Sequence, residues 1–166
     1  MIITSLYAGL LGLLLCILSV RVISVRRTTG VGLGHGDEIA LERRIRAQGN
    51  FAEYVPLAIV PIGALELAGQ NAIVLHLLGI GLFLGRLLHG WALSFSRKNA
   101  SARIAGMVLT LVMLSVASVL NLAVYSSRLL DLGWGRGEWG FAGLPEWIPR
   151  TGRTGIACGN RNKSVT

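Results

Sequence analysis

The chain has 166 residues, of which 52% are hydrophobic and 14% are charged, and its formal net charge is +8. Soluble domains average about 25% charged residues, so this composition excludes an ordinary soluble domain and indicates a membrane protein. The chain lacks the interleaved basic and aromatic residues of single-strand binders, so the positive charge predicts membrane lipid as a partner and no nucleic acid.

Four apolar segments are each long enough to cross a membrane, which needs about 20 residues. They lie at residues 2–25, 38–68, 72–95 and 104–125. The sequence therefore predicts an all-α fold, an integral membrane four-helix bundle, over residues 1–125. The first segment lacks the basic start and the cleavage pattern of a signal peptide, so we expect it to be retained as a span.

Basic residues mark the first and third loops, whereas the second loop, near Gly69, has none. The positive-inside rule therefore predicts that the first and third loops are cytoplasmic and that the N-terminus lies outside. Plain loops without eukaryotic sorting signals favour a bacterial inner membrane.

The segment 126–166 has a different composition from the rest. It holds eight glycines and the tryptophans at 134, 139 and 147, and it follows neither a helical nor a strand period. We expect a polar tail that is disordered, lies on the membrane surface or is not native to the fold. Cys16 and Cys158 are not expected to form a disulfide, and no metal-binding spacing is present.

The second span begins with a polar face inside a segment that must enter the membrane. On an ideal helix Arg43, Arg46, Asn50 and Glu53 fall within an arc of about 80°. Charged groups at such depth usually face the protein interior and mark a functional site. Guanidinium groups bind carboxylates, and a carboxylate binds an ammonium, so the set predicts a small zwitterionic ligand that carries more negative than positive groups.

In the third span Arg86, His89 and Leu93 share one face. Arg86 is too deep for snorkelling alone, and Glu53 is at a similar depth, so an ion pair between them is expected. That pair belongs either to a shared ligand site or to a structural contact, and His89 acts either as an acid or base or as a packing residue.

Other polar residues of the spans have simpler interpretations. His76 and Asn121 are expected to form hydrogen bonds between helices, and Glu66 is expected to lie exposed among the headgroups. Glycines at 79, 81 and 85 are expected to allow close helix packing.

Two stretches of the chain have an unusual spacing of charged and polar residues. They are Val22-Ile23-Ser24-Val25-Arg26-Arg27 and, after a polar loop, Glu42-Arg43-x-x-Arg46-Ala47-Gln48-x-Asn50-x-x-Glu53-Tyr54-x-Pro56. Together they resemble the MAPEG family, the membrane-associated proteins of eicosanoid and glutathione metabolism. The resemblance extends over about residues 2–125. It implies a homotrimer of four-helix subunits that bind glutathione as cosubstrate between neighbours, and an enzyme similar to glutathione transferases.

The resemblance also assigns site residues. Those implied to hold glutathione are Arg26, Arg27, Arg46, Gln48, Asn50, Glu53, Tyr54 and Arg86. Candidate catalytic residues are Arg103, Arg86 and His89. Leu93 departs from the family pattern, because it stands where well-studied members have a tyrosine that contacts the ligand.

The implied chemistry agrees with the residue types. Glutathione has two carboxylates, one ammonium and one thiol with a pKa of about 8.5, and a nearby guanidinium such as that of Arg86 or Arg103 favours the nucleophilic thiolate. The expected activity is conjugation to, or reduction of, a lipophilic electrophile or hydroperoxide. Two alternatives stay open: a non-enzymatic trimer that binds a small anion, and a solute-binding membrane module such as a transporter.

Overall fold

The computed structural model describes residues 1–95 and 100–131. In these ranges the chain forms four helices, namely α1 (Ile2–Thr29), α2 (Ile39–Leu67), α3 (Ala72–Phe95) and α4 (Ala100–Asp131). Each is long and apolar enough to cross a membrane. The chain is therefore a four-helix membrane bundle, as the sequence predicts.

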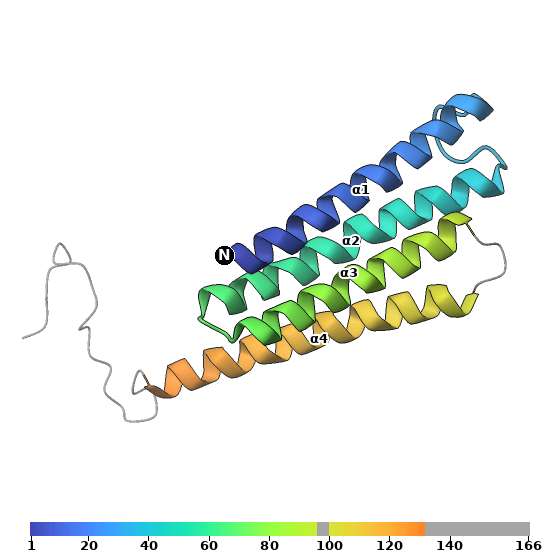
Figure 1. The fold of residues 1–166 in the computed structure, drawn as a ribbon. Coiled ribbons are helices and arrows are strands. Elements are labelled where there is room, and N and C mark those ends of the chain that lie inside the picture. The colour runs from blue at the N-terminus through green and yellow to red at the C-terminus, as the bar shows by residue number, and fades with distance from the viewer. Residues whose placement is uncertain (96–99, 132–166) are drawn as a thin grey trace, which may run out of the picture. The chain divides into compact units, whose positions relative to one another are not determined.

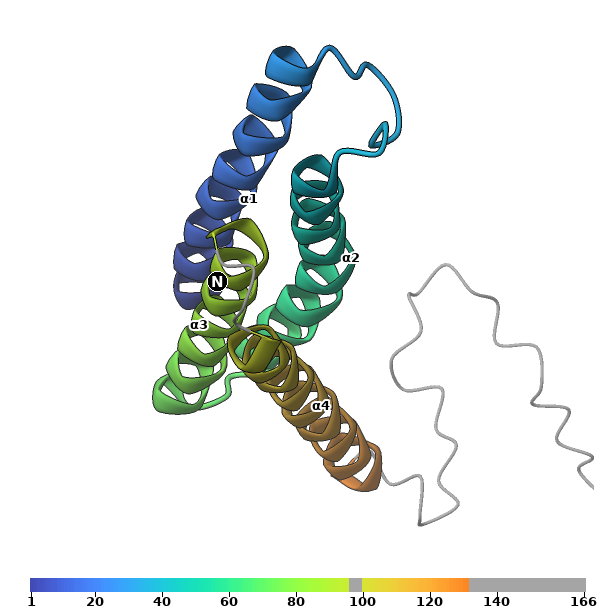
Figure 2. The same ribbon diagram turned by 90° about the vertical axis from the view of Figure 1, so that its right-hand side faces the viewer.

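The helices run antiparallel to their neighbours along the chain (Figure 1). α1, α2 and α3 pack against one another, and the view in Figure 2 shows α4 beside α3 and away from α1. The helix ends that the basic loops predict to be cytoplasmic therefore lie together at one end of the bundle, where α2 and α4 begin and α1 and α3 end (Figure 1).

The predicted spans match the helices closely in the middle of the chain and less closely at its ends. α1 extends to Thr29 and α4 extends to Asp131, beyond the predicted ends at residues 25 and 125. The basic and polar residues in these last turns can leave the hydrocarbon without ending the helix. Residues 126–131 of the predicted tail thus belong to α4, and residues 132–166, with the tryptophans and Cys158, lie outside the described residues.

Local sequence explains where the helices end. Gly30 takes the left-handed conformation at φ 72° and its N–H donates to the carbonyl of Arg26, which ends α1. Gly69, at φ 83°, has the same role after α2. The side chain of Asn71 accepts a 2.8 Å hydrogen bond from the N–H of Ile73 and caps the start of α3.

The start of α1 is capped from a distant part of the chain. The two carboxylate oxygens of Glu66, near the end of α2, accept hydrogen bonds from the N–H groups of Ile3 at 3.0 Å and Thr4 at 2.8 Å. The ammonium of Met1 lies 3.6 Å from the same carboxylate. The expectation that Glu66 lies exposed among headgroups is therefore wrong: its side chain is 12% exposed, because the unsatisfied N–H groups of a helix start attract a carboxylate.

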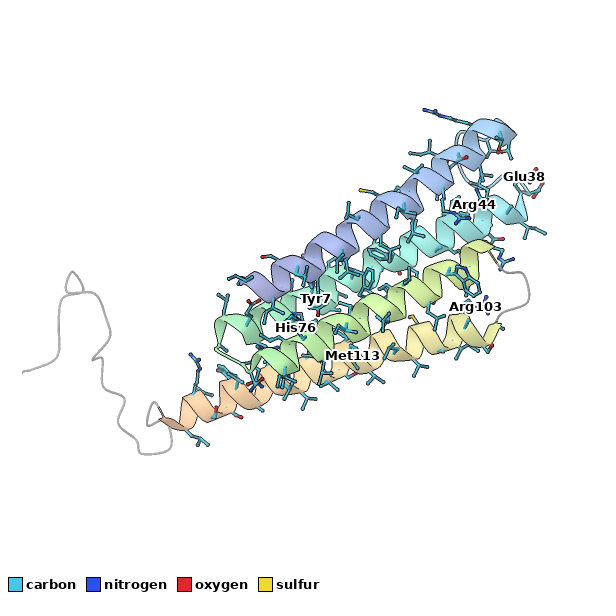
Figure 3. The ribbon with its side chains drawn as sticks, in the orientation of Figure 1. Tyr7, Glu38, Arg44, His76, Arg103 and Met113 are labelled. Atoms are coloured by element: carbon cyan, nitrogen blue, oxygen red, sulfur yellow. The ribbon has the colours of Figure 1, made fainter. Side chains whose placement is uncertain are left out.

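The predicted contacts between helices are present. Tyr7 on α1 and Nδ1 of His76 on α3 form a 2.8 Å hydrogen bond. In Figure 3 both side chains lie toward the end of the bundle where α1 and α3 begin. Asn121 on α4 donates a 2.9 Å hydrogen bond to the carbonyl of Pro61 on α2. Polar groups within the bundle thus satisfy one another instead of facing lipid.

The glycines of α3 permit its close approach to neighbouring helices. A Cβ at Gly79 would clash with the ring of Tyr7, and one at Gly81 would lie 2.5 Å from the sulfur of Met113. At the crossing of α3 and α4, a Cβ at Gly106 would lie 2.7 Å from the carbonyl oxygen of Gly85. Only glycine fits at these positions without displacement of a neighbour.

Candidate functional site

A cleft of about 400 Å³ opens at the end of the bundle where α2 and α4 begin. Three helices contribute to its walls. The lining residues are Ile45, Arg46, Gly49, Asn50 and Glu53 from α2, His89 and Leu93 from α3, and Arg103 from α4. Arg103 is labelled at this end of the bundle in Figure 3.

Three of the four residues of the polar face predicted for α2 line one wall of the cleft, whereas the fourth, Arg43, donates a 3.4 Å hydrogen bond to the carbonyl of Ala92 on α3. Residues at 46, 49, 50 and 53 follow helical spacing, so their side chains point to the same side. The Nε of Arg46 lies 3.2 Å from a carboxylate oxygen of Glu42, and the Arg46 side chain is 74% exposed. The Arg46 guanidinium therefore keeps access to a ligand.

Arg86 lies behind this wall and is 1% exposed. Its Nη1 donates to the backbone carbonyl of Asn50 at 3.2 Å and to the side-chain Oδ1 of Asn50 at 3.1 Å. Its Nη2 donates to the sulfur of Met107 at 3.7 Å, and its guanidinium carbon lies 5.8 Å from the centre of the Tyr54 ring.

The expected ion pair between Arg86 and Glu53 is therefore wrong for the described residues. Glu53 is exposed at the cleft. Arg86 instead donates to Asn50, which lies about one helical turn before Glu53 on α2. A carboxylate buried beside Arg86 would lose its hydration, whereas an amide oxygen and a carbonyl accept from Nη1 at a smaller desolvation cost. The Nε of Arg86 is buried without a hydrogen-bond partner among the described residues.

Contact with Arg86 determines how Asn50 faces the cleft. Because Oδ1 of Asn50 accepts from Arg86, the Nδ2 group is the part of the amide that remains to act on a ligand, and it can only donate. The cleft thus combines two guanidinium groups (Arg46 and Arg103) and an amide donor with one carboxylate, Glu53.

His89 connects α3 to the start of α4. Its Nδ1 donates a 3.1 Å hydrogen bond to the backbone carbonyl of Arg103, and the ring is 6% exposed. In the neutral ring, Nε2 is then the nitrogen that can accept a proton. Both expected roles of His89 are compatible with this position, since it packs the helices and lines the cleft.

Three of the expected ligand residues lie elsewhere in this chain. Arg26 donates to the carbonyls of Val31 and Gly32 in the first loop, at 3.2 and 3.1 Å, and Arg27 is exposed at the end of α1. Gln48 donates to Ser19 on α1 at 3.1 Å. They line the α1 side of the bundle, whereas the cleft is on the side of α3 and α4.

Some cleft residues were not anticipated. Gly49 and Ile45 line the cleft, and helical spacing from Arg46 and Asn50 is the pattern that could have identified them. The contact of Arg86 with Met107 has no such pattern, because α4 is separate from α3 in sequence. Leu93, 7% exposed, lines the cleft at the position where the resemblance expects a tyrosine hydroxyl.

The fold and the site define the class: a four-helix membrane bundle with an arginine-lined cleft at one end. Residues 4–123 match the MAPEG family, and the chain belongs to that family. The inner membrane protein YecN of Escherichia coli (strain K12) is 39% identical over 87 residues, which cover 52% of this chain and 66% of YecN. YecN of a second Escherichia coli strain, O6:H1, gives the same values. The match thus spans just under two thirds of the length of these relatives.

Proposed function

We propose that the protein is a membrane-bound, glutathione-dependent transferase or peroxidase that acts on lipophilic electrophiles or hydroperoxides. The observation that carries this proposal is the charge arrangement of the cleft, where Arg46, Asn50 and Arg103 surround the space that Glu53 also lines. Membership of the MAPEG family supports the choice of glutathione among zwitterionic ligands.

Three of the four charged or reactive groups of glutathione, namely one carboxylate, the ammonium and the thiol, have a complementary group in the cleft. The guanidinium of Arg46 and the Nδ2 of Asn50 donate to a carboxylate, and Glu53 accepts from the ammonium. Arg103 lies across the cleft on α4 and places positive charge near the thiol, which favours the thiolate. Arg86 and Tyr54 support this wall from behind through the contact of Arg86 with Asn50.

The reaction combines an activated thiolate with a substrate held nearby. In conjugation, the sulfur forms a bond to the electrophilic carbon, and the leaving group departs or the product takes up a proton. In reduction, two glutathione molecules give their electrons to a hydroperoxide, which yields an alcohol, water and glutathione disulfide. Nε2 of His89 is placed to take or give the proton.

The apolar part of the cleft suits the second substrate. Leu93 and Ile45 line it beside the charged groups, and outward surfaces of the helices are apolar, so a lipophilic molecule can reach the site from the bilayer. Because Leu93 lacks a hydroxyl, it adds apolar surface where a tyrosine would bind glutathione.

A homotrimer would bring the remaining residues to the site. Arg26, Arg27 and Gln48 lie on the α1 side of the bundle, so they would serve the cleft of a neighbouring subunit. We place the protein in an inner membrane, like its relative the inner membrane protein YecN, with the N-terminus outside and the first and third loops in the cytoplasm.

Titration calorimetry of the detergent-purified protein with glutathione tests the proposal. We expect binding that is lost in Arg46→Ala and in Glu53→Gln and that is kept in Arg128→Ala, which removes a cation at the opposite end of the bundle. Binding should be followed by turnover with a model electrophile and a lipid hydroperoxide. A folded protein that does not bind glutathione contradicts the proposal.

A non-enzymatic role is the second candidate, because Leu93 removes a hydroxyl from the site. It predicts that glutathione or a related anion raises the unfolding temperature without turnover of any electrophile. A solute-binding module that transports its ligand would instead show flux in liposomes.

A further inference from the structure

A second group of basic residues lies between α1 and α2, away from the cleft. The Nη1 of Arg44 on α2 donates a 3.1 Å hydrogen bond to the backbone carbonyl of Arg21 on α1. Nearby, Nε2 of Gln48 donates to the hydroxyl of Ser19 at 3.1 Å. These contacts hold Arg21 and Arg44 at the same depth on adjacent helices, and Arg44 is labelled between the two helices in Figure 3.

The depth of this pair follows from the length of α1. Residues 2–20 carry no charge, and at 1.5 Å per residue they span about 28 Å. The hydrocarbon core of a bilayer is about 30 Å thick. Arg21 therefore lies where the hydrocarbon meets the headgroups, at the level of the lipid phosphates.

The surface next to the pair suits a lipid. Leu13, Ile17 and Val20 lie on the same side of α1 as Arg21 and are 66%, 57% and 63% exposed. Both arginines are half-buried. A guanidinium has five N–H donors, and among the described residues one donor of Arg44 is used for the carbonyl of Arg21.

We propose that Arg21 and Arg44 bind the phosphate of an anionic phospholipid whose acyl chains follow the apolar side of α1. The hydrogen bond from Arg44 to the backbone of Arg21 brings two positively charged residues together on adjacent helices, and an anion at this level of the bundle is attracted by both. Guanidinium groups match phosphate oxygens in geometry as well as in charge. Arg21 and Arg44 are not among the residues that line the proposed glutathione cleft of the same chain.

Native mass spectrometry of the full chain in detergent tests the site. The probes are phosphatidylglycerol and phosphatidylcholine of the same chain length. We expect phosphatidylglycerol to be retained in preference to phosphatidylcholine. Arg21→Gln and Arg44→Gln should each lower this preference roughly fivefold, and the double variant should abolish it.

The matched control is Arg128→Gln, which makes the same change of charge. Nη2 of Arg128 donates to the carbonyl of Ala68 at the other end of the bundle, so the lipid preference should stay as in the wild type. An equal loss in this control would mean attraction by net charge alone and would overturn the proposal.

Two further measurements distinguish a phospholipid from other possible ligands of the Arg21–Arg44 site. Equal binding of free glycerol phosphate would show a site for soluble phosphate. A changed oligomer mass of Arg44→Gln with unchanged lipid preference would show that Arg44 contacts a second copy of the chain. Either result overturns the proposal. Thermal unfolding in detergent checks that the variants are folded. Arg44→Lys, which keeps the charge and loses the planar donor geometry, should show a preference between those of the wild type and Arg44→Gln.

Discussion

Arg86 shows how a buried charge can act at a distance from a ligand. It is almost completely buried, and its partners among the described residues are uncharged, so it carries the cost of desolvation without a carboxylate. Its contact with Oδ1 of Asn50 fixes the direction of an amide that lines the cleft. We therefore assign Arg86 as a positioning residue of the proposed site.

Arg86→Met should weaken glutathione binding by about tenfold or more, since a hydrogen bond to a charged group contributes about 1.5–3 kcal/mol. The expected cause is free rotation of the Asn50 amide. Arg86→Lys should recover part of the affinity, because one ammonium donor can still reach Oδ1. Calorimetry gives the affinities, and wild-type binding by a folded Arg86→Met protein would exclude the assignment.

Glu66 gives a prediction about stability at the opposite end of the bundle. Glu66→Ala removes both acceptors of the Ile3 and Thr4 N–H groups and should lower the free energy of unfolding by about 1–2 kcal/mol. Glu66→Gln keeps one acceptor oxygen and should lose less. Thermal unfolding in detergent measures both, and equal stability of the alanine variant and the wild type would argue against the cap.

At the scale of whole helices, the crossing of α3 and α4 positions the α4 wall of the cleft, which carries Arg103, relative to the walls formed by α2 and α3. Gly106 contacts Gly85 closely, and one turn before Gly106 the carbonyl of Arg103 accepts from His89. The backbone separation at the glycines thus determines how near Arg103 comes to the residues of α2 and α3. Stability and site geometry depend on the same contact.

Gly106→Ala should lower stability by about 1–3 kcal/mol, because the added Cβ would lie 2.7 Å from the carbonyl oxygen of Gly85 and from the N–H nitrogen of His89. It should also weaken glutathione binding by displacing Arg103. Gly12→Ala is the control, since no heavy atom lies within 4 Å of a Cβ there. If both substitutions have the same effect on thermal unfolding, close packing at the crossing is not the cause.

The helices themselves were predictable from sequence, because a bilayer requires long apolar segments and glycine or asparagine marks their ends. The polar face of α2 was also predictable, since Arg46, Asn50 and Glu53 have helical spacing within one element. Contacts between elements were not. The partner of Arg86 depends on the relative rotation of α2 and α3, and the cap from Glu66 on Thr4 joins residues 62 positions apart.

For the whole molecule, the proposed homotrimer predicts a polypeptide mass of three times 17.7 kDa in detergent. Multi-angle light scattering after size-exclusion chromatography measures this mass once the detergent is subtracted. Arg26 and Gln48 are not among the residues that line the cleft of their own chain, so the trimer would account for their expected role. A monodisperse monomer that binds glutathione would show that the cleft is sufficient by itself.

The predicted orientation can be tested with single cysteines. In a protein with Cys16→Ser and Cys158→Ser, Gly32→Cys lies in the first loop and Gln70→Cys lies in the second. In intact cells an impermeant maleimide should label only Gln70→Cys, because the positive-inside rule places the first loop in the cytoplasm. Labelling of Gly32→Cys alone would reverse the orientation.

The cap of α1 has a consequence for biosynthesis. The first helix is made and enters the bilayer while its leading N–H groups still lack a protein partner. Their acceptor, Glu66, is synthesised 62 residues after Thr4 and must then be carried to the same side of the membrane at the far end of α2. In the predicted orientation, with the N-terminus outside, completion of α1 requires translocation of this carboxylate, so we expect the two helices to reach their final state as a hairpin.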